Sequence, residues 1–177
     1  MHPQLQKAFT RSERQRLVLL DSLSKVSTAD LNKIPAPGKW SASEIIAHLI
    51  VAERLSIAYM KKKIQGVEQV DDSGWREEMK MLLLQLSQRV PGLKFKAPHY
   101  IVENTPSFTD FESLKSEWDK TRDEFREFLK SISEKHIKRK IYKHARVGYL
   151  NVQHAIIFFG EHVTHHATQI RKLTKRK

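Results

Sequence analysis

Two stretches of the chain decide its fold and its chemistry: GEHVTHHATQIRKL at residues 160–173 and GKWSASEIIAHL at residues 38–49. In the first stretch, His162 and His166 are four residues apart, so a helix places both side chains on one face, one turn apart. In the second stretch, His48 falls on the apolar stripe of another predicted helix. Three imidazoles from two packed helices are enough to hold a divalent metal ion with coordination positions left open.

Apolar residues recur at intervals of three and four along most of the chain, which is the spacing of amphipathic helices. Two helix starts carry the spacing of a capping box, with Ser41 followed by Glu44 and Thr109 followed by Glu112. No segment shows the period-two alternation of a β-strand. The expected helices cover residues 3–26, 41–63, 75–90, 109–132 and 151 onward. They predict an all-α protein, a four-helix bundle with short extra helices and a long irregular loop around residues 91–108.

The composition is that of one ordinary folded domain, residues 1–177, with a basic tail at about residues 172–177. The best apolar run, AIIFF at residues 155–159, is far shorter than the roughly 18 residues of a membrane span. The N-terminal residues lack the apolar core of a secretory signal. We therefore expect a cytoplasmic protein with no membrane partner. The absence of cysteine excludes disulfides, a thiolate-bound zinc and a cysteine nucleophile.

The formal charge of +12 is concentrated in the last part of the chain. From Lys135 to the end there are 11 Lys and Arg residues against one acidic residue, Glu161, a net charge of +10 that leaves only +2 for the remainder. This region is either a solvated basic surface or a surface for anionic partners. A nucleic-acid-binding module is the less favoured alternative, because only Tyr142 and Tyr149 interleave the basic stretch as stacking platforms.

The remaining histidines differ in how they relate to the predicted pair on the last helix. His154 lies eight residues before His162, so it could face the same cavity from two turns away. His165 points about 100° away from His166, toward solvent or beside the site. His144 lies in the connector before the last helix and is expected at the surface. The pair at His162 and His166 could also be hydrogen-bonded or half-exposed instead of ligating, and without a glutamate between them it does not match a zinc protease.

Three patterns in the chain resemble motifs of one known family, the DinB/YfiT-like superfamily. The pattern W-S-x-x-E-I-x-x-H-L at residues 40–49 resembles the opening motif, and H-x-x-x-H-x-x-Q-I at residues 162–170 resembles the closing motif. Between them, HARVGYLNVQHAIIF at residues 144–158 resembles the H-P-x-x-G-x-L pattern that precedes the last helix, with Ala145 where proline is common. The resemblance covers about residues 5–173.

This resemblance implies a four-helix bundle that is commonly a homodimer and holds a metal through three histidines. Carried over residue by residue, it implies that His48, His162 and His166 bind the metal, which in the family can be zinc, nickel or iron. Relatives include S-transferases that use bacillithiol, mycothiol or glutathione, mycothiol-dependent isomerases, and stress-induced members without a known activity. The family's link to DNA damage is one of induction and does not imply DNA binding.

We favour a metal-dependent transferase of a low-molecular-weight thiol, with that thiol and an electrophile as its small-molecule partners. A thiol that binds a metal loses its proton near neutral pH and becomes a nucleophile, and without cysteine the sulfur must come from a cosubstrate. Arg146 and Arg171 are candidates to bind a cosubstrate carboxylate. Hydrolysis by water activated at the same metal is the neighbouring alternative. A non-catalytic, stress-related metal-binding protein of the same fold is another, and the sequence identifies no general base.

Overall fold

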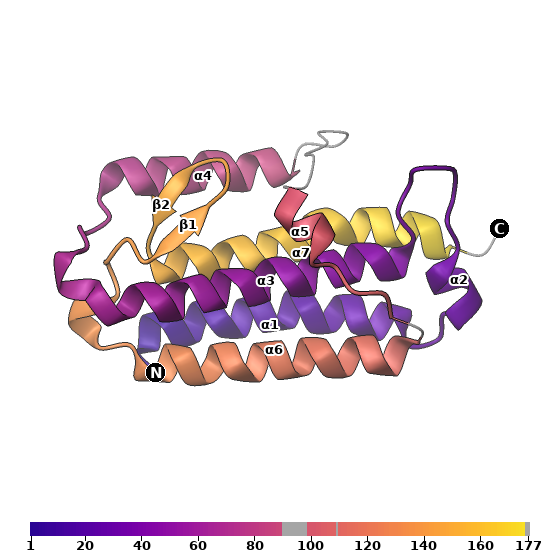
Figure 1. Cartoon of the computed structure of the whole chain (residues 1–177), viewed down its shortest axis with the longest axis horizontal. Helices are drawn as coiled ribbons and strands as arrows, with labels where there is room; N and C mark the ends of the chain where they lie inside the picture. Colours follow the sequence, from indigo (N-terminus) through magenta and orange to yellow (C-terminus); the bar gives the residue numbers. More distant parts are fainter. Residues whose placement is uncertain (90–98, 109, 176–177) are drawn as a thin grey trace.

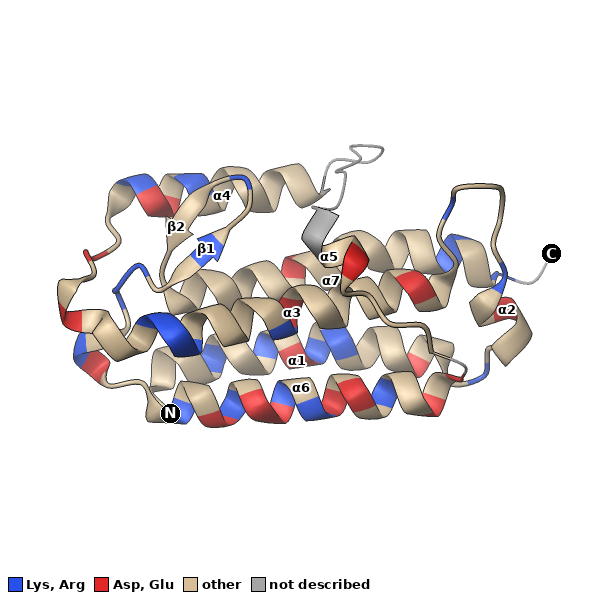
Figure 2. Cartoon of the chain, viewed as in Figure 1, with Lys and Arg blue, Asp and Glu red and all other residues tan. Residues whose placement is uncertain are grey.

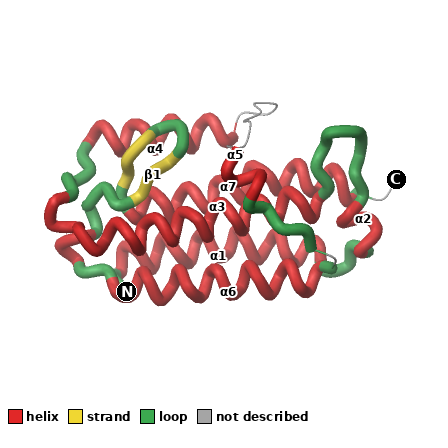
Figure 3. The backbone as a smooth tube through the Cα atoms, in the orientation of Figure 1, coloured by secondary structure: helices red, strands yellow, loops and turns green. Residues whose placement is uncertain are grey.

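Four long helices lie side by side and form the predicted bundle, as Figure 1 and Figure 3 show. They are α1 (Pro3–Leu23), α3 (Ala42–Lys63), α6 (Phe111–Ser131) and α7 (Val152–Thr174). Each of α1 and α3 packs against both α6 and α7, so α1 and α3 are diagonal to each other. This computed structural model describes residues 1–89, 99–108 and 110–175. Because α7 continues to Thr174, the first residues of the predicted basic tail are helical.

Side-chain caps fix where the two helices of the candidate site begin. At the start of α3, Ser41 Oγ accepts a hydrogen bond from the Glu44 N–H at 3.2 Å, and the Glu44 carboxylate accepts one from the Ser41 N–H at 2.7 Å. The predicted capping box is therefore complete. At the start of α7, Asn151 Oδ1 accepts a hydrogen bond from the His154 N–H at 2.9 Å. These caps set the helical phase of every histidine that follows.

The start of α6 differs from the prediction by one residue. Its N-cap is Asp110, whose carboxylate accepts hydrogen bonds from the N–H and the hydroxyl of Ser113, both at 2.8 Å. Thr109, the cap that the sequence predicts, lies outside the described residues. Aspartate and threonine are both favourable N-caps, so the sequence alone does not decide between adjacent candidates.

Apolar side chains fill the bundle in two buried clusters. In one cluster the rings of Phe125 and Phe159 lie 5.3 Å apart between α6 and α7. The other cluster contains Trp118 of α6, Ile46 of α3 and Val163 of α7, all fully buried. The second cluster flanks the candidate site, because its α3 and α7 members are sequence neighbours of the site histidines.

A buried ion pair links α3 to α6 inside the bundle. Arg122 donates a hydrogen bond to Glu53 at 2.7 Å, and both side chains are about 1% exposed. Glu53 also accepts a hydrogen bond from the Trp118 indole at 3.1 Å, and Arg122 donates one to the Ser12 hydroxyl of α1 at 3.1 Å. Because a buried charge without partners is costly, this network favours one register among the three helices.

A further helix, α4 (Trp75–Arg89), packs along α7 outside the four-helix core (Figure 1). The two helices run in parallel, because Glu78 contacts His154 near their starts and the Gln88 carbonyl contacts His165 further along both. Of the predicted loop around residues 91–108, residues 91–98 lie outside the described residues, and the rest contains a short helix. The short helical segments of the chain are α2 (Thr28–Asn32), η1 (Ile64–Gln69), α5 (His99–Glu103) and η2 (Glu134–His136).

A small β-hairpin before α7 is a feature that the sequence analysis did not predict. Strands β1 (Tyr142–His144) and β2 (Gly148–Leu150) pair antiparallel, with His144 opposite Gly148. Gly148 has φ +78°, a left-handed conformation that glycine adopts at little cost, and it closes the three-residue turn. Strands of three residues are too short to show an alternating pattern, so periodicity alone could not reveal them.

Much of the charge in the connector before the hairpin is paired with acidic residues of neighbouring segments. Lys135 and Arg139 both lie within 4.0 Å of the Glu68 carboxylate, and Lys140 lies 3.7 Å from Glu77 at the start of α4. Along α6, acidic and basic residues alternate over the outer surface (Figure 2). These ion pairs offset part of the positive charge that the sequence concentrates in this region. Among the described residues, no helix is long and apolar enough to span a membrane.

Candidate metal centre

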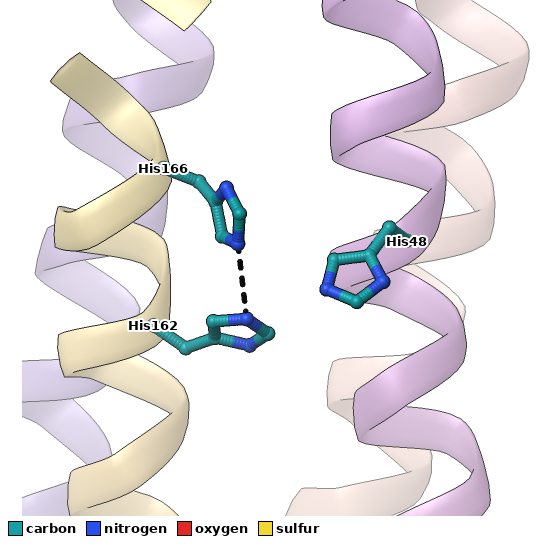
Figure 4. Close-up of side chains that lie close together, drawn as sticks. All are labelled: His48, His162 and His166. Atoms are coloured by element: carbon teal, nitrogen blue, oxygen red, sulfur yellow. Dashed lines mark hydrogen bonds between the residues drawn. The ribbon is translucent and has the colours of Figure 1, made fainter. Parts of the chain in front are cut away.

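Three histidine side chains converge between α3 and α7 (Figure 4). His48 projects from α3, and His162 and His166 project from successive turns of α7. Their ring centroids lie 5.2 Å apart for His48 and His162, 5.4 Å for His48 and His166, and 4.8 Å for His162 and His166. One ring nitrogen from each lies within 4.8 Å of the other two. Among the described residues, these three histidines are the group of side chains that lie close enough together to hold a metal ion.

The local sequence explains half of this arrangement. The helical period places His162 and His166 one above the other, and their Nε2 atoms lie 3.1 Å apart. His48 follows the Ser41 cap by two turns, which places it on the face of α3 that packs against α7. The meeting of His48 with the α7 pair therefore depends on the packing of the two helices and not on any local pattern.

The donor atoms fit a divalent cation. A tetrahedral site with metal–nitrogen distances of about 2.0–2.1 Å places ligand nitrogens roughly 3.3–3.4 Å apart, close to the separation already seen between His162 and His166. His166 Nδ1 donates a hydrogen bond to Gln169 Oε1 at 2.8 Å, which leaves the Nε2 lone pair directed at the cluster. His48 Nδ1 is buried and has no hydrogen-bond partner. A cation would remove the cost of such an isolated polar atom.

Burial keeps these imidazoles neutral. It lowers the pKa of His48 and of His166 to about 4, with the hydrogen bond to Gln169 opposing the shift at His166. The pKa of His162 lies well below its ordinary value, first because of burial and then because of the neighbouring His166 and His48. All three side chains are therefore uncharged at neutral pH, so each ring has one nitrogen with a lone pair, which is the protonation state that a metal ligand needs.

Aromatic rings border the cluster on two sides. The Trp40 ring lies 5.3 Å from His48, and the Phe158 ring stacks on His162 at 5.0 Å with an interplanar angle of 21°. Beyond Phe158, the ring of His144 lies 4.5 Å from the phenyl ring. The cluster is thus enclosed by apolar surface on these sides, which limits the access of water.

The position of His144 corrects the expectation that it lies at the surface. Its side chain is only 8% exposed, because the hairpin folds it onto Phe158 of α7. Burial lowers its pKa to about 4, and the nearby charge of Arg146 adds to the shift. The sequence signal that could have placed it is the hairpin turn closed by Gly148, which is invisible to helical periodicity.

The structure does not bring every other predicted site residue to the cluster. His165 lies beside it, with its ring 5.0 Å from His166 and its Nδ1 2.8 Å from the Gln88 carbonyl oxygen of α4. His154 lies about 12 Å along the helix axis from His162. It is buried, and its Nε2 contacts the Glu78 carboxylate of α4 at 3.1 Å.

The two arginines predicted to bind anions differ in position. Arg146 is an exposed residue of the hairpin turn, two residues after His144 and close enough to lower the pKa of that histidine. Arg171 is also exposed, five residues after His166, which is about 140° around the helix. Arg146 therefore lies close to His144, and Arg171 projects from a different face of α7 than His166.

Comparison with known proteins identifies one family and one similar fold. The sequence profile of the DinB superfamily matches residues 10–170. Among solved structures, the chain is similar to YfiT from Bacillus subtilis, described as a probable metal-dependent hydrolase with an unusual four-helix bundle topology. The TM-score is 0.58 at 12% sequence identity, covering 98% of this chain and 87% of that one. No curated protein matches this sequence.

Proposed function

Because this chain belongs to the DinB superfamily, we propose that it is a metal-dependent enzyme whose divalent cation is held by His48, His162 and His166. The observation that carries the proposal is the convergence of three neutral imidazoles, each offering a nitrogen within 4.8 Å of the others. Zinc, nickel and iron all accept imidazole ligands. The resemblance of the chain's motifs to a three-histidine metal family supports the same assignment.

The reaction that we propose is the transfer of a low-molecular-weight thiol to an electrophile. A cation with three neutral ligands keeps its full positive charge and open coordination positions, and so lowers the pKa of a thiol that binds there. The residues of this chain orient the ligands and exclude water. Gln169 fixes the ring of His166, and Trp40 and Phe158 cover two sides of the cluster. The absence of cysteine from the chain is consistent with a sulfur nucleophile that comes from a cosubstrate.

Hydrolysis is the second candidate, and one observation favours it. YfiT, whose fold this chain shares, is described as a probable metal-dependent hydrolase. The same cluster could lower the pKa of a water molecule instead of a thiol. The two reactions differ in one measurable respect, because a hydrolase consumes its substrate without a thiol and a transferase does not.

The experiment begins with the metal. We expect the purified protein to bind about one zinc, nickel or iron ion per chain by elemental analysis, and His162→Ala to lose it. His154→Gln is the matched control, because this buried histidine lies on the same helix outside the cluster, and it should keep the metal. The loaded protein is then incubated with monochlorobimane and a panel of thiols, and with p-nitrophenyl acetate alone. Thiol-dependent conjugation supports the transferase, thiol-independent ester cleavage supports the hydrolase, and neither reaction in fully loaded protein contradicts both.

A further inference from the structure

The side chain of His144 borders the candidate centre, and the hairpin turn fixes it in one tautomer. Its Nδ1 accepts hydrogen bonds from the N–H groups of Arg146 and Val147, at 3.3 Å and 3.4 Å. A ring nitrogen that accepts two N–H groups carries a lone pair and no proton, so in the neutral ring the proton is on Nε2. The hairpin turn therefore fixes His144 as a hydrogen-bond donor through Nε2–H.

This donor has no hydrogen-bond partner in the described part of the chain. None of the described residues hydrogen-bonds to His144 Nε2, and the atom is not among the sealed polar atoms without a partner, unlike Nδ1 of His48. Nε2–H is thus open to a ligand, although the side chain as a whole is 8% exposed. A nearly buried ring whose one fixed donor stays accessible is the arrangement expected of a recognition group, because the ring is held in place while its N–H can still meet a ligand.

The position of this donor connects it to the three-histidine cluster. The ring of Phe158 contacts both side chains: its centroid lies 4.5 Å from that of His144, and it stacks on His162 at 5.0 Å. His144 is also close enough to influence the protonation of His162 electrostatically. The ring centroids of His144 and His162 can therefore be at most about 9.5 Å apart, a span that a short ligand bound at the cluster could cover. Arg146, the charged residue of the hairpin turn, makes the surface beside His144 attractive to an anion.

We propose that His144 Nε2–H binds the carboxylate of a thiol substrate whose sulfur occupies the metal centre. This inference rests on the proposed function and narrows it to thiols that carry a carboxylate within a few bonds of the sulfur. His144 acts by positioning the substrate, and the hairpin that holds its tautomer is the structural device that makes this possible.

The test uses the protein loaded with Co²⁺, because a thiolate bound to cobalt gives a charge-transfer absorption band that reports binding without turnover. Mercaptoacetate, 3-mercaptopropionate and 4-mercaptobutanoate are titrated against alkanethiols of the same lengths. We expect at least one carboxylate thiol to bind about tenfold or more tightly than its alkanethiol, the effect of one hydrogen bond to a charged group.

Two substitutions separate recognition from hairpin folding. In His144→Asn, the amide oxygen can still accept hydrogen bonds from the N–H groups of Arg146 and Val147, as in an Asx-turn, but the Nε2–H donor is lost. His144→Phe loses both. Both variants should keep the cobalt content and the affinity for alkanethiols. We expect His144→Asn to lose the preference for the carboxylate thiol, which a purely structural role of His144 would leave unchanged. Because a neutral histidine is replaced by a neutral residue, the overall charge does not change.

Each outcome has one meaning. Loss of the preference in His144→Asn supports the inference. A preference that His144→Asn retains, or no preference in the unmodified protein while alkanethiols still bind, overturns the inference and leaves the proposed function intact. Cobalt-loaded protein that shows no thiolate band with any thiol overturns the proposed thiol transfer and this inference with it.

Discussion

Replacing His48 by leucine should stabilise the metal-free protein, and more so in acid. The side chain of His48 is 5% exposed, and its Nδ1 has no hydrogen-bond partner. An isolated buried polar group costs about 1–3 kcal/mol, which leucine avoids at similar volume. We therefore expect the free energy of unfolding of His48→Leu at pH 7.5 to exceed that of the unmodified protein by an amount in this range. Such a gain in stability at the expense of a functional site is a common trade-off.

The pH dependence follows from the lowered pKa of His48. Burial lowers this pKa from 6.5 to about 4, so between these values the unfolded chain binds more protons than the folded protein. The free energy of unfolding must then fall as the pH drops below about 6.5. For one such group, linkage gives a loss of about 2 kcal/mol between pH 7.5 and pH 5.0. His48→Leu lacks this group, so the gap between the two proteins should widen by about that amount at pH 5.0.

The measurement is urea unfolding, followed by circular dichroism, of both proteins after treatment with EDTA at the two pH values. Both proteins contain the other buried histidines, so the comparison removes their contributions apart from the part of the pKa lowering of His162 and His166 that His48 itself causes. Equal stability at pH 7.5 would show that Nδ1 finds a partner in solution. A gap that stays constant between pH 7.5 and pH 5.0 would refute the claim that His48 is held neutral by burial.

Three further outcomes follow from the structure. Arg122→Met leaves the Glu53 carboxylate buried without its partner, so urea unfolding should show that the free energy of unfolding falls by about 3–5 kcal/mol. A second substitution, Glu53→Leu, should largely restore the stability. A fall below about 1 kcal/mol would contradict this expectation. Gly148→Ala forces an L-residue to φ +78° and should lower the unfolding free energy by about 1–2 kcal/mol, whereas Gly74→Ala, at a residue without positive φ and with open space for a methyl group, should have a small effect in the same assay. Zinc at about 100 times its dissociation constant should raise Tm by about 5–10 °C, and His162→Ala should abolish this shift. An equal shift in His162→Ala would refute the assignment of the metal to this cluster.

The sequence is sufficient for those parts of the candidate site that lie within one helix. The spacing of His162 and His166 fixes their side chains on one face, and the Ser41 capping box fixes the phase of His48 on α3. These are local consequences of the helical period. Likewise, the amphipathic segments are long enough for their periodicity to identify the long helices, but it does not reveal that α4 lies outside the four-helix core.

The residues whose positions sequence reasoning missed are those whose surroundings come from another element. Helical phase allowed His154 to face the cluster, but α4 packs in parallel along α7 and supplies Glu78 as its partner. His144 does not belong to a helical pattern, and the antiparallel pairing of β1 with β2 places its ring against Phe158.

The chain by itself determined that two imidazoles share a helical face and that a third lies on the inner stripe of another helix, because neighbours three or four residues apart are set by backbone geometry alone. Only the tertiary structure decided that His48 lies beside His162 and His166, more than 110 residues further along the chain. It also decided that His154 contacts Glu78 and that His144 borders the centre. Contacts between distant segments depend on how whole helices pack, and packing is settled by the sum of many side chains that no single motif contains.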